Sequence, residues 1–175
     1  MKIKTENILK FLKVLSWMIF IGILITTGVL IVSFTLSFIN PELFMSSFEG
    51  GENWYELKQQ SNNFYNNAMF FNIVFSLTHA YIWYLIIELF TKINLGNPFN
   101  INVSKKLEFI AYLLLALGIL GIVGNKIFSE KLRQYEVKFV FEFDAGYIFI
   151  AGIVYIISQI FKRGVELQEE NELTI

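Results

Sequence analysis

The chain has 175 residues, of which 55% are hydrophobic and 17% charged, and its formal net charge is −1. The weak net charge argues against a nucleic-acid-binding surface, which needs a strong basic excess, and the absence of cysteine excludes disulfides, thiolate metal sites and cysteine nucleophiles. Because a soluble domain carries about a quarter charged residues and the apolar residues here come in long blocks, the composition predicts a membrane protein.

Four blocks are long and apolar enough to cross a bilayer, which takes about 20 predominantly apolar residues. The first has no charged residue from Val14 to Ile39. It is longer than the apolar region of a signal peptide, about 7–15 residues, so we expect a retained helix. We predict spans at residues 14–39, 68–90, 107–128 and 144–162. With short connections, these predict an all-α fold, a four-transmembrane-helix antiparallel bundle forming one domain over residues 1–175.

The distribution of basic residues predicts the orientation in the membrane, since lysine and arginine are in excess on the cytoplasmic side. They gather before the first span, between the second and third, and after the fourth, at Lys2, Lys4, Lys10, Lys13, Lys92, Lys105, Lys106, Lys162 and Arg163. We therefore expect a multi-pass protein of the cell (inner) membrane with both termini in the cytoplasm. The inner loop is then 91–106 and the tail 163–175. The outer loops are 40–67, where Lys58 is the one basic residue, and 129–143, which carries both signs and does not support this orientation.

The outer loops contain two further patterns. In the first, "NWYELKQQ" predicts a helix at the outer interface, with Trp54 and Tyr55 at headgroup level. In the second, the apolar residues of "VKFVFEFD" alternate with mostly polar ones, which is the period of a strand. A lone strand has no obvious partner here, so an interfacial segment and the beginning of the fourth span stay open as alternatives.

The second span carries polar residues at helical spacing, and they share one face: Asn72, Ser76, His79 and Trp83. The first span offers a matching stripe at Gly22, Thr26, Ser33 and Ser37. One interpretation is a polar pocket or an ion path, because an ionisable residue inside a membrane is a candidate functional group. The simpler interpretation, which we favour, is interhelical hydrogen bonding that holds the bundle together.

Signatures of catalysis are absent from the sequence, which has no paired-histidine helix, nucleophile elbow or phosphate-binding glycine loop. We therefore expect a protein that is not an enzyme and has no catalytic, cofactor-binding or metal-binding residues. The expected surroundings are the lipid bilayer and other proteins.

Two segments on the expected cytoplasmic side carry a family resemblance. "LGNPFNINVSKKLE" and "FKRGVELQEENELTI" resemble the inner-loop G-x-P-F segment and the C-terminal RGxxLxxExELT[IV] signature of a bacterial family of four-span membrane proteins of unknown function. The resemblance implies no catalytic residue. Members are often encoded beside a small helix-turn-helix regulator, which implies a membrane-bound regulatory role.

These segments define a candidate cytoplasmic docking surface, with acids and apolar residues on the tail and basic residues on the loop. Its members are Pro98, Phe99, Lys105, Lys106, Arg163, Gly164, Leu167, Glu170, Leu173, Thr174 and Ile175. The tail either packs on the protein's own inner loop or binds a partner, such as a helix-turn-helix regulator or another membrane protein. A solvated cap on the fourth span remains the simpler alternative. The competing function is a small transporter or channel subunit that uses the polar face of span two, for which a homodimer would be needed.

Overall fold

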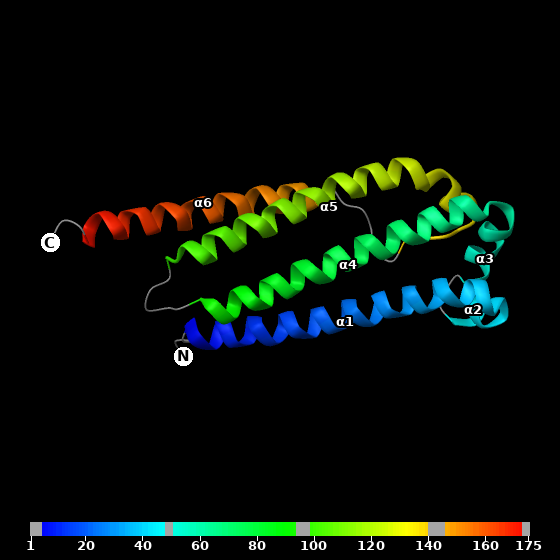
Figure 1. Cartoon of the computed structure of the whole chain (residues 1–175), viewed down its shortest axis with the longest axis horizontal. Helices are drawn as coiled ribbons and strands as arrows, with labels where there is room; N and C mark the ends of the chain where they lie inside the picture. Colours follow the sequence, from blue (N-terminus) through cyan, green and yellow to red (C-terminus); the bar gives the residue numbers. More distant parts are fainter. Residues whose placement is uncertain (1–4, 48–50, 94–98, 140–145, 173–175) are drawn as a thin grey trace. The chain divides into compact units, whose positions relative to one another are not determined.

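The computed structural model describes residues 5–47, 51–93, 99–139 and 146–172, and these residues form helices and short connections without a strand (Figure 1). The helices are α1 (Thr5–Ile39), α2 (Pro41–Ser47), α3 (Gly51–Gln60), α4 (Asn62–Lys92), α5 (Ile101–Gln134) and α6 (Gly146–Glu172). The predicted all-α fold is thereby confirmed.

Four of these helices, α1, α4, α5 and α6, are long and apolar enough to cross a membrane. They extend beyond the apolar blocks of the sequence: α4 begins at Asn62, α5 ends at Gln134 and α6 continues to Glu172. The ends of α5 and α6 are rich in Leu, Glu, Gln and Lys, which cost little in a helix. The beginning of α4 is rich in Asn instead, and packing of Tyr65 in the core holds it. The described part of the predicted tail is therefore the last part of α6.

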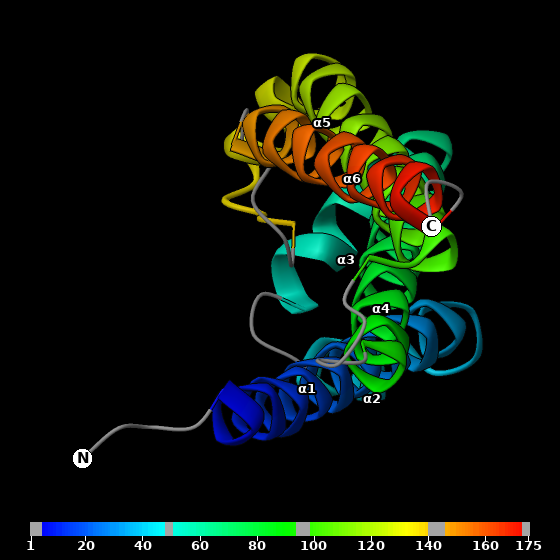
Figure 2. The same cartoon turned by 90° about the vertical axis from the view of Figure 1, so that its left-hand side faces the viewer.

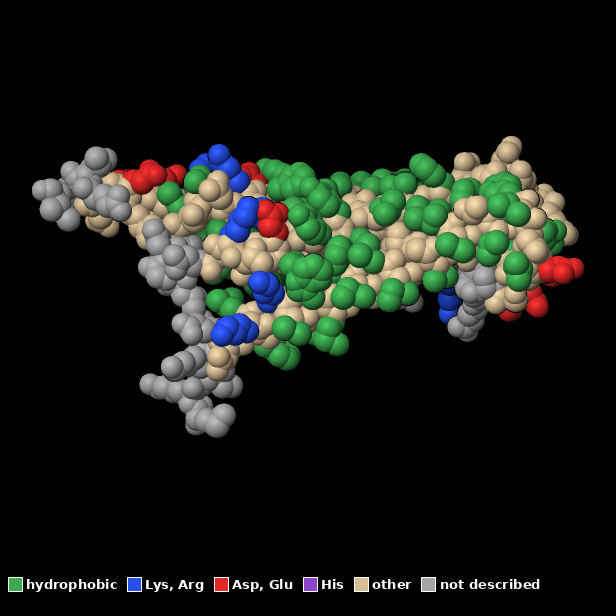
Figure 3. All heavy atoms as spheres, turned by 60° about the horizontal axis from the view of Figure 1, so that its bottom comes forward, with side chains coloured by type: hydrophobic (Ala, Val, Ile, Leu, Met, Phe, Trp, Pro, Cys, Tyr) green, Lys and Arg blue, Asp and Glu red, His purple; other side chains and the backbone are tan. Residues whose placement is uncertain are grey.

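Large apolar side chains cover the outside of the long helices, as the face in Figure 3 shows, with charged side chains gathered near the helix ends. Met18 on α1 is 66% exposed and Phe149 on α6 is 72% exposed. Such a surface would be costly in water, at about 25 cal/mol per Å² of apolar area. The four helices and this surface define a multi-pass membrane protein.

The chain divides into two compact units. The first takes in Met1–Phe20, Tyr81–Ile119 and Ala145–Ile175, and the second takes in Ile21–Ala80 and Leu120–Asp144. In the first unit α6 lies antiparallel along the beginning of α5 (Figures 1 and 2). The Ser104 hydroxyl donates to the Ser158 carbonyl oxygen at 2.9 Å. A Cβ on Gly118 would lie 2.5 Å from Cγ1 of Ile148, so glycine lets α5 and α6 approach closely, as expected for packing in lipid.

In the second unit α2 and α3 pack with the beginning of α4 and the end of α5. Their core consists of Phe44, Trp54, Leu57, Tyr65, Ala68, Met69, Phe128, Leu132 and Val137. The helix predicted around "NWYELKQQ" is confirmed as α3. Trp54 is 3% exposed because its ring packs on Tyr65 at 6.1 Å between centroids, so its side chain belongs to this core. Tyr55 is half-buried beside Phe44.

The segment "VKFVFEFD" is described only as far as Phe139, and over Val137–Phe139 it is irregular. Its alternation is nevertheless real there. Val137 is buried, Lys138 is exposed, and Phe139 packs on Trp54 and Phe128. Over these three residues the alternation places two apolar side chains in the core of this unit. Phe141 and Phe143 lie outside the described residues.

Candidate functional site

The predicted polar face of α4 forms a buried contact with α1 in the second unit. Ser76 is fully buried, and its hydroxyl oxygen lies 2.5 Å from that of Thr27. Thr27 donates its own hydroxyl to the Ile23 carbonyl oxygen at 2.7 Å, so Ser76 is the donor in the interhelical bond. Two hydroxyls that bond across helices inside the bilayer typically contribute about 0.6 kcal/mol. The geometry is that of a packing contact.

Asn72 and His79 lie one turn to either side of Ser76 on α4. Asn72 is 1% exposed, and its Nδ2 has no hydrogen-bond partner within the described segments of the chain. His79 is half-buried, and Trp83 is half-buried in the other unit. Asn72 and Ser76 are therefore enclosed by protein, whereas His79 is only partly so.

The matching stripe predicted on α1 is partly wrong. Gly22 and Thr26 are exposed, and a Cβ on Gly22 would meet no atom within 4 Å. The buried residues of α1 in this unit are instead Ile23, Thr27, Leu30, Ser33 and Ser37. The spacing of four, three, three and four keeps one narrow face toward the protein, and its apolar members Ile23 and Leu30 fix which threonine points inward.

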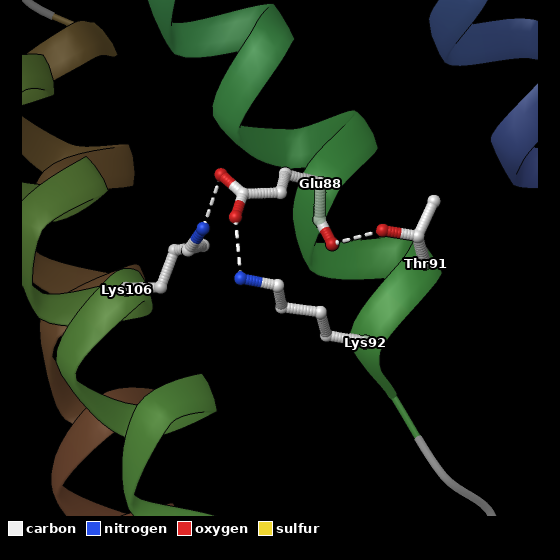
Figure 4. Close-up of polar contacts among 4 residues, drawn as sticks. All are labelled: Glu88, Thr91, Lys92 and Lys106. Atoms are coloured by element: carbon white, nitrogen blue, oxygen red, sulfur yellow. Dashed lines mark hydrogen bonds and ion pairs between the residues drawn. The ribbon is translucent and has the colours of Figure 1, made fainter.

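An ion cluster joins α4 and α5 in the first unit (Figure 4). The Glu88 carboxylate binds Nζ of Lys92 at 2.6 Å and Nζ of Lys106. The Thr91 hydroxyl donates to the Glu88 carbonyl oxygen at 2.6 Å. Lys106, a predicted docking residue, is thus held inside the unit, with its side chain 17% exposed. Lys105 beside it is exposed.

Two other predicted docking residues are brought together in the same unit. The Phe99 ring lies against Gly164 of α6, where a Cβ would come within 2.7 Å of both Cε1 and Cγ of the ring. The ring also packs edge-on against Phe161, with centroids 5.6 Å apart. Gly164 stands inside a continuous helix, where glycine costs about 1 kcal/mol relative to alanine, and the close approach of Phe99 explains its presence. Phe99 therefore points into an apolar contact within this unit.

The remaining predicted docking residues lie on or beyond the end of α6. Arg163 is exposed and binds the Glu166 carboxylate at 2.8 Å. Leu167 is 46% exposed, and Glu170 is exposed. Pro98, Leu173, Thr174 and Ile175 lie outside the described residues.

Sequence reasoning missed the role of Lys58, although its isolation among the acids of loop 40–67 was a signal. Its ammonium donates to the Ser37 carbonyl oxygen and lies 3.3 Å from the Ser37 hydroxyl oxygen. It also stands 4.1 Å from the centroid of the Phe38 ring. Lys58 thereby caps the C-terminal end of α1, where carbonyl groups lack helical partners. Burial lowers the pKa of the Lys58 ammonium below its ordinary value.

The described residues contain no group of three or more histidine and acidic side chains that could hold a metal ion. The described residues form a four-span membrane protein with a packed polar contact between α1 and α4 and a loop-to-helix contact at Phe99. The chain belongs to the family described as "Protein of unknown function (DUF2975)", which matches residues 55–175. Both segments that carry the resemblance lie within that match. No curated protein and no solved structure matches the chain.

Proposed function

We propose that this chain is a non-enzymatic membrane protein of regulatory or interaction type, whose inner loop and C-terminal helix form a cytoplasmic docking surface. The observation that carries the proposal is the contact of Phe99 with Gly164 and Phe161. It attaches the described end of the inner loop to α6, so that the two segments form one surface.

The chemistry of that surface indicates the kind of partner. Past Arg163 the helix presents Leu167, Glu169 and Glu170 as exposed side chains. A partner that places an apolar side chain against Leu167 and basic side chains beside the acids would be complementary to it. A small helix-turn-helix regulator, which the family resemblance implies, has a basic surface that meets this requirement.

Removing residues 168–175 should lower the affinity for such a partner by about tenfold or more, the loss expected when a few charged and apolar contacts are removed. The measurement is biolayer interferometry of the chain in nanodiscs against a purified small helix-turn-helix regulator of the kind that the family resemblance implies. The control is Glu130→Gln, which removes an exposed acid of the second unit that is not among the docking residues. Unchanged affinity after the deletion would contradict the proposal.

The proposal also requires both termini in the cytoplasm of a cell whose inner membrane holds the four helices. The basic residues of the inner loop and of the first and last segments support this orientation. A cysteine placed after Ile175 should therefore stay unlabelled by a membrane-impermeant maleimide in intact cells and react after permeabilisation, whereas one placed at Gln59 should react in intact cells. The reverse labelling pattern would exclude a cytoplasmic docking surface.

The alternative of a transporter or channel subunit has less support. Its polar face would have to line a path for a solute, but Asn72 and Ser76 are enclosed and Ser76 is bonded to Thr27. These contacts support packing rather than transport.

A further inference from the structure

A hollow of about 380 Å³ lies in the second unit, where α1 ends and α3 and α4 meet. The residues that line it include Ser37, Phe38, Tyr55, Lys58, Gln59 and Asn62. The apolar block of α1 ends at Ile39, and α4 begins at Asn62, ahead of its own apolar block. This is the end at which α1 would leave the hydrocarbon, so the hollow would lie at the level of lipid headgroups.

The charged residue that lines this hollow is Lys58. Lys58 is half-buried, and none of the described carboxylates lies within ion-pair distance of its ammonium. Its protein contacts are the Ser37 oxygens and the ring faces of Phe38 and Tyr65. A lysine has three N–H donors, so one remains for a ligand. Because a charge removed from water is costly without a counter-charge, an anion bound in the hollow would stabilise the Lys58 ammonium.

The other lining groups fit one kind of anion. The carboxamide groups of Gln59 and Asn62 supply further N–H donors, and the Phe38 and Tyr55 rings supply apolar walls. The volume is near the lower end for ligand sites, which begin at about 300 Å³, and so suits a headgroup rather than a whole lipid. Phe38 and Ile39 are 54% and 74% exposed beside it, where acyl chains would lie.

We propose that this hollow binds the phosphate group of an anionic amphiphile, with the Lys58 ammonium as its counter-charge and the Gln59 and Asn62 amides as additional donors. The proposal is independent of the docking surface. The same phosphate chemistry occurs in a lipid headgroup and in free phosphate, and the test distinguishes these two sources.

The test is native mass spectrometry of the whole chain in a neutral detergent, titrated with dioctanoyl phosphatidylglycerol. We expect one saturable adduct. Lys58→Gln should weaken it by about tenfold or more, the effect of losing one charge-assisted hydrogen bond. Gln59→Glu should weaken it similarly, because the new carboxylate competes with the phosphate while the Lys58 cap on α1 is kept. This second variant tests the site even if Lys58→Gln perturbs the fold.

The matched control is Lys131→Gln. Lys131 is also in the second unit and lies 4.9 Å from the centroid of an aromatic ring, that of Phe64, but it does not line the hollow. Its loss should change affinity by about twofold at most, as for an exposed charge. Displacement of the lipid by inorganic phosphate would assign the site to phosphate in general, and resistance to it would assign the site to the lipid headgroup. No saturable adduct, an equal loss in Lys131→Gln, or undiminished binding in both Lys58→Gln and Gln59→Glu would overturn the proposal.

Discussion

Replacing Gly164 with alanine is expected to destabilise the chain by about 1–3 kcal/mol, the usual cost of adding a methyl group to a packed contact. The new Cβ would overlap the Phe99 ring. The ring would then have to move, and it would lose its contact with Phe161. The measurement is the midpoint of thermal unfolding in detergent, converted to a free energy of unfolding with the enthalpy of the transition.

Gly152→Ala is the matched control for this prediction. It lies on the same helix, and a Cβ there would meet no atom within 4 Å, so alanine should be neutral or stabilise α6 by up to about 1 kcal/mol through helix propensity. The double variant Phe99→Ala/Gly164→Ala should be less destabilised than the sum of the single variants, because removing the ring removes the overlap. If Gly164→Ala behaves like Gly152→Ala, the loop does not pack on α6 in this way.

Replacing Phe44 with alanine should cost about 3–5 kcal/mol of stability in the second unit, as for other buried aromatic residues. The Phe44 side chain is fully buried, and its ring lies 6.2 Å from that of Tyr65 and 6.3 Å from that of Tyr55. Its removal leaves a cavity at the centre of the contact between α2 and α3. Denaturant-induced unfolding monitored by tryptophan fluorescence reports the change, since Trp54 belongs to the same core.

Leu43→Ala serves as the comparison on the same short helix. Leu43 is 54% exposed, so its truncation should lower the free energy of unfolding by less than about 0.5 kcal/mol, as for other surface substitutions. Equal effects of the two substitutions would mean that α2 does not anchor this unit through Phe44.

The four long helices could be predicted from the sequence because lipid provides no hydrogen-bond partners for the backbone. A long apolar run can therefore cross a membrane only as a helix or within a closed barrel. The helix ends could not be predicted in this way. The polar residues at the beginning of α4, from Asn62, and at the end of α6, up to Glu172, are helical through propensity and packing. Hydropathy measures neither of these.

The candidate sites were predictable to different degrees. Asn72 and Ser76 were found because residues four apart share a helical face. On α1 the sequence analysis named Thr26, whereas Thr27 is the residue that makes the contact. A step of one residue turns a helix by about 100°, which is enough to move a side chain to another face. Phe99 and Gly164 were found from the family resemblance. Lys58 was missed because its partners, the Ser37 oxygens and the Phe38 ring, lie about twenty residues away along the chain and become neighbours only in the fold.

The continuity of α6 from its lipid-exposed part to its acidic end has a mechanical consequence. A helix of 27 residues is a rod about 40 Å long, and it has no break between Phe149 and Glu170. When a bilayer thins, a spanning rod tilts rather than shortens. The same tilt would move Leu167 and Glu170 sideways. A change in bilayer thickness would therefore change the position of the C-terminal acids.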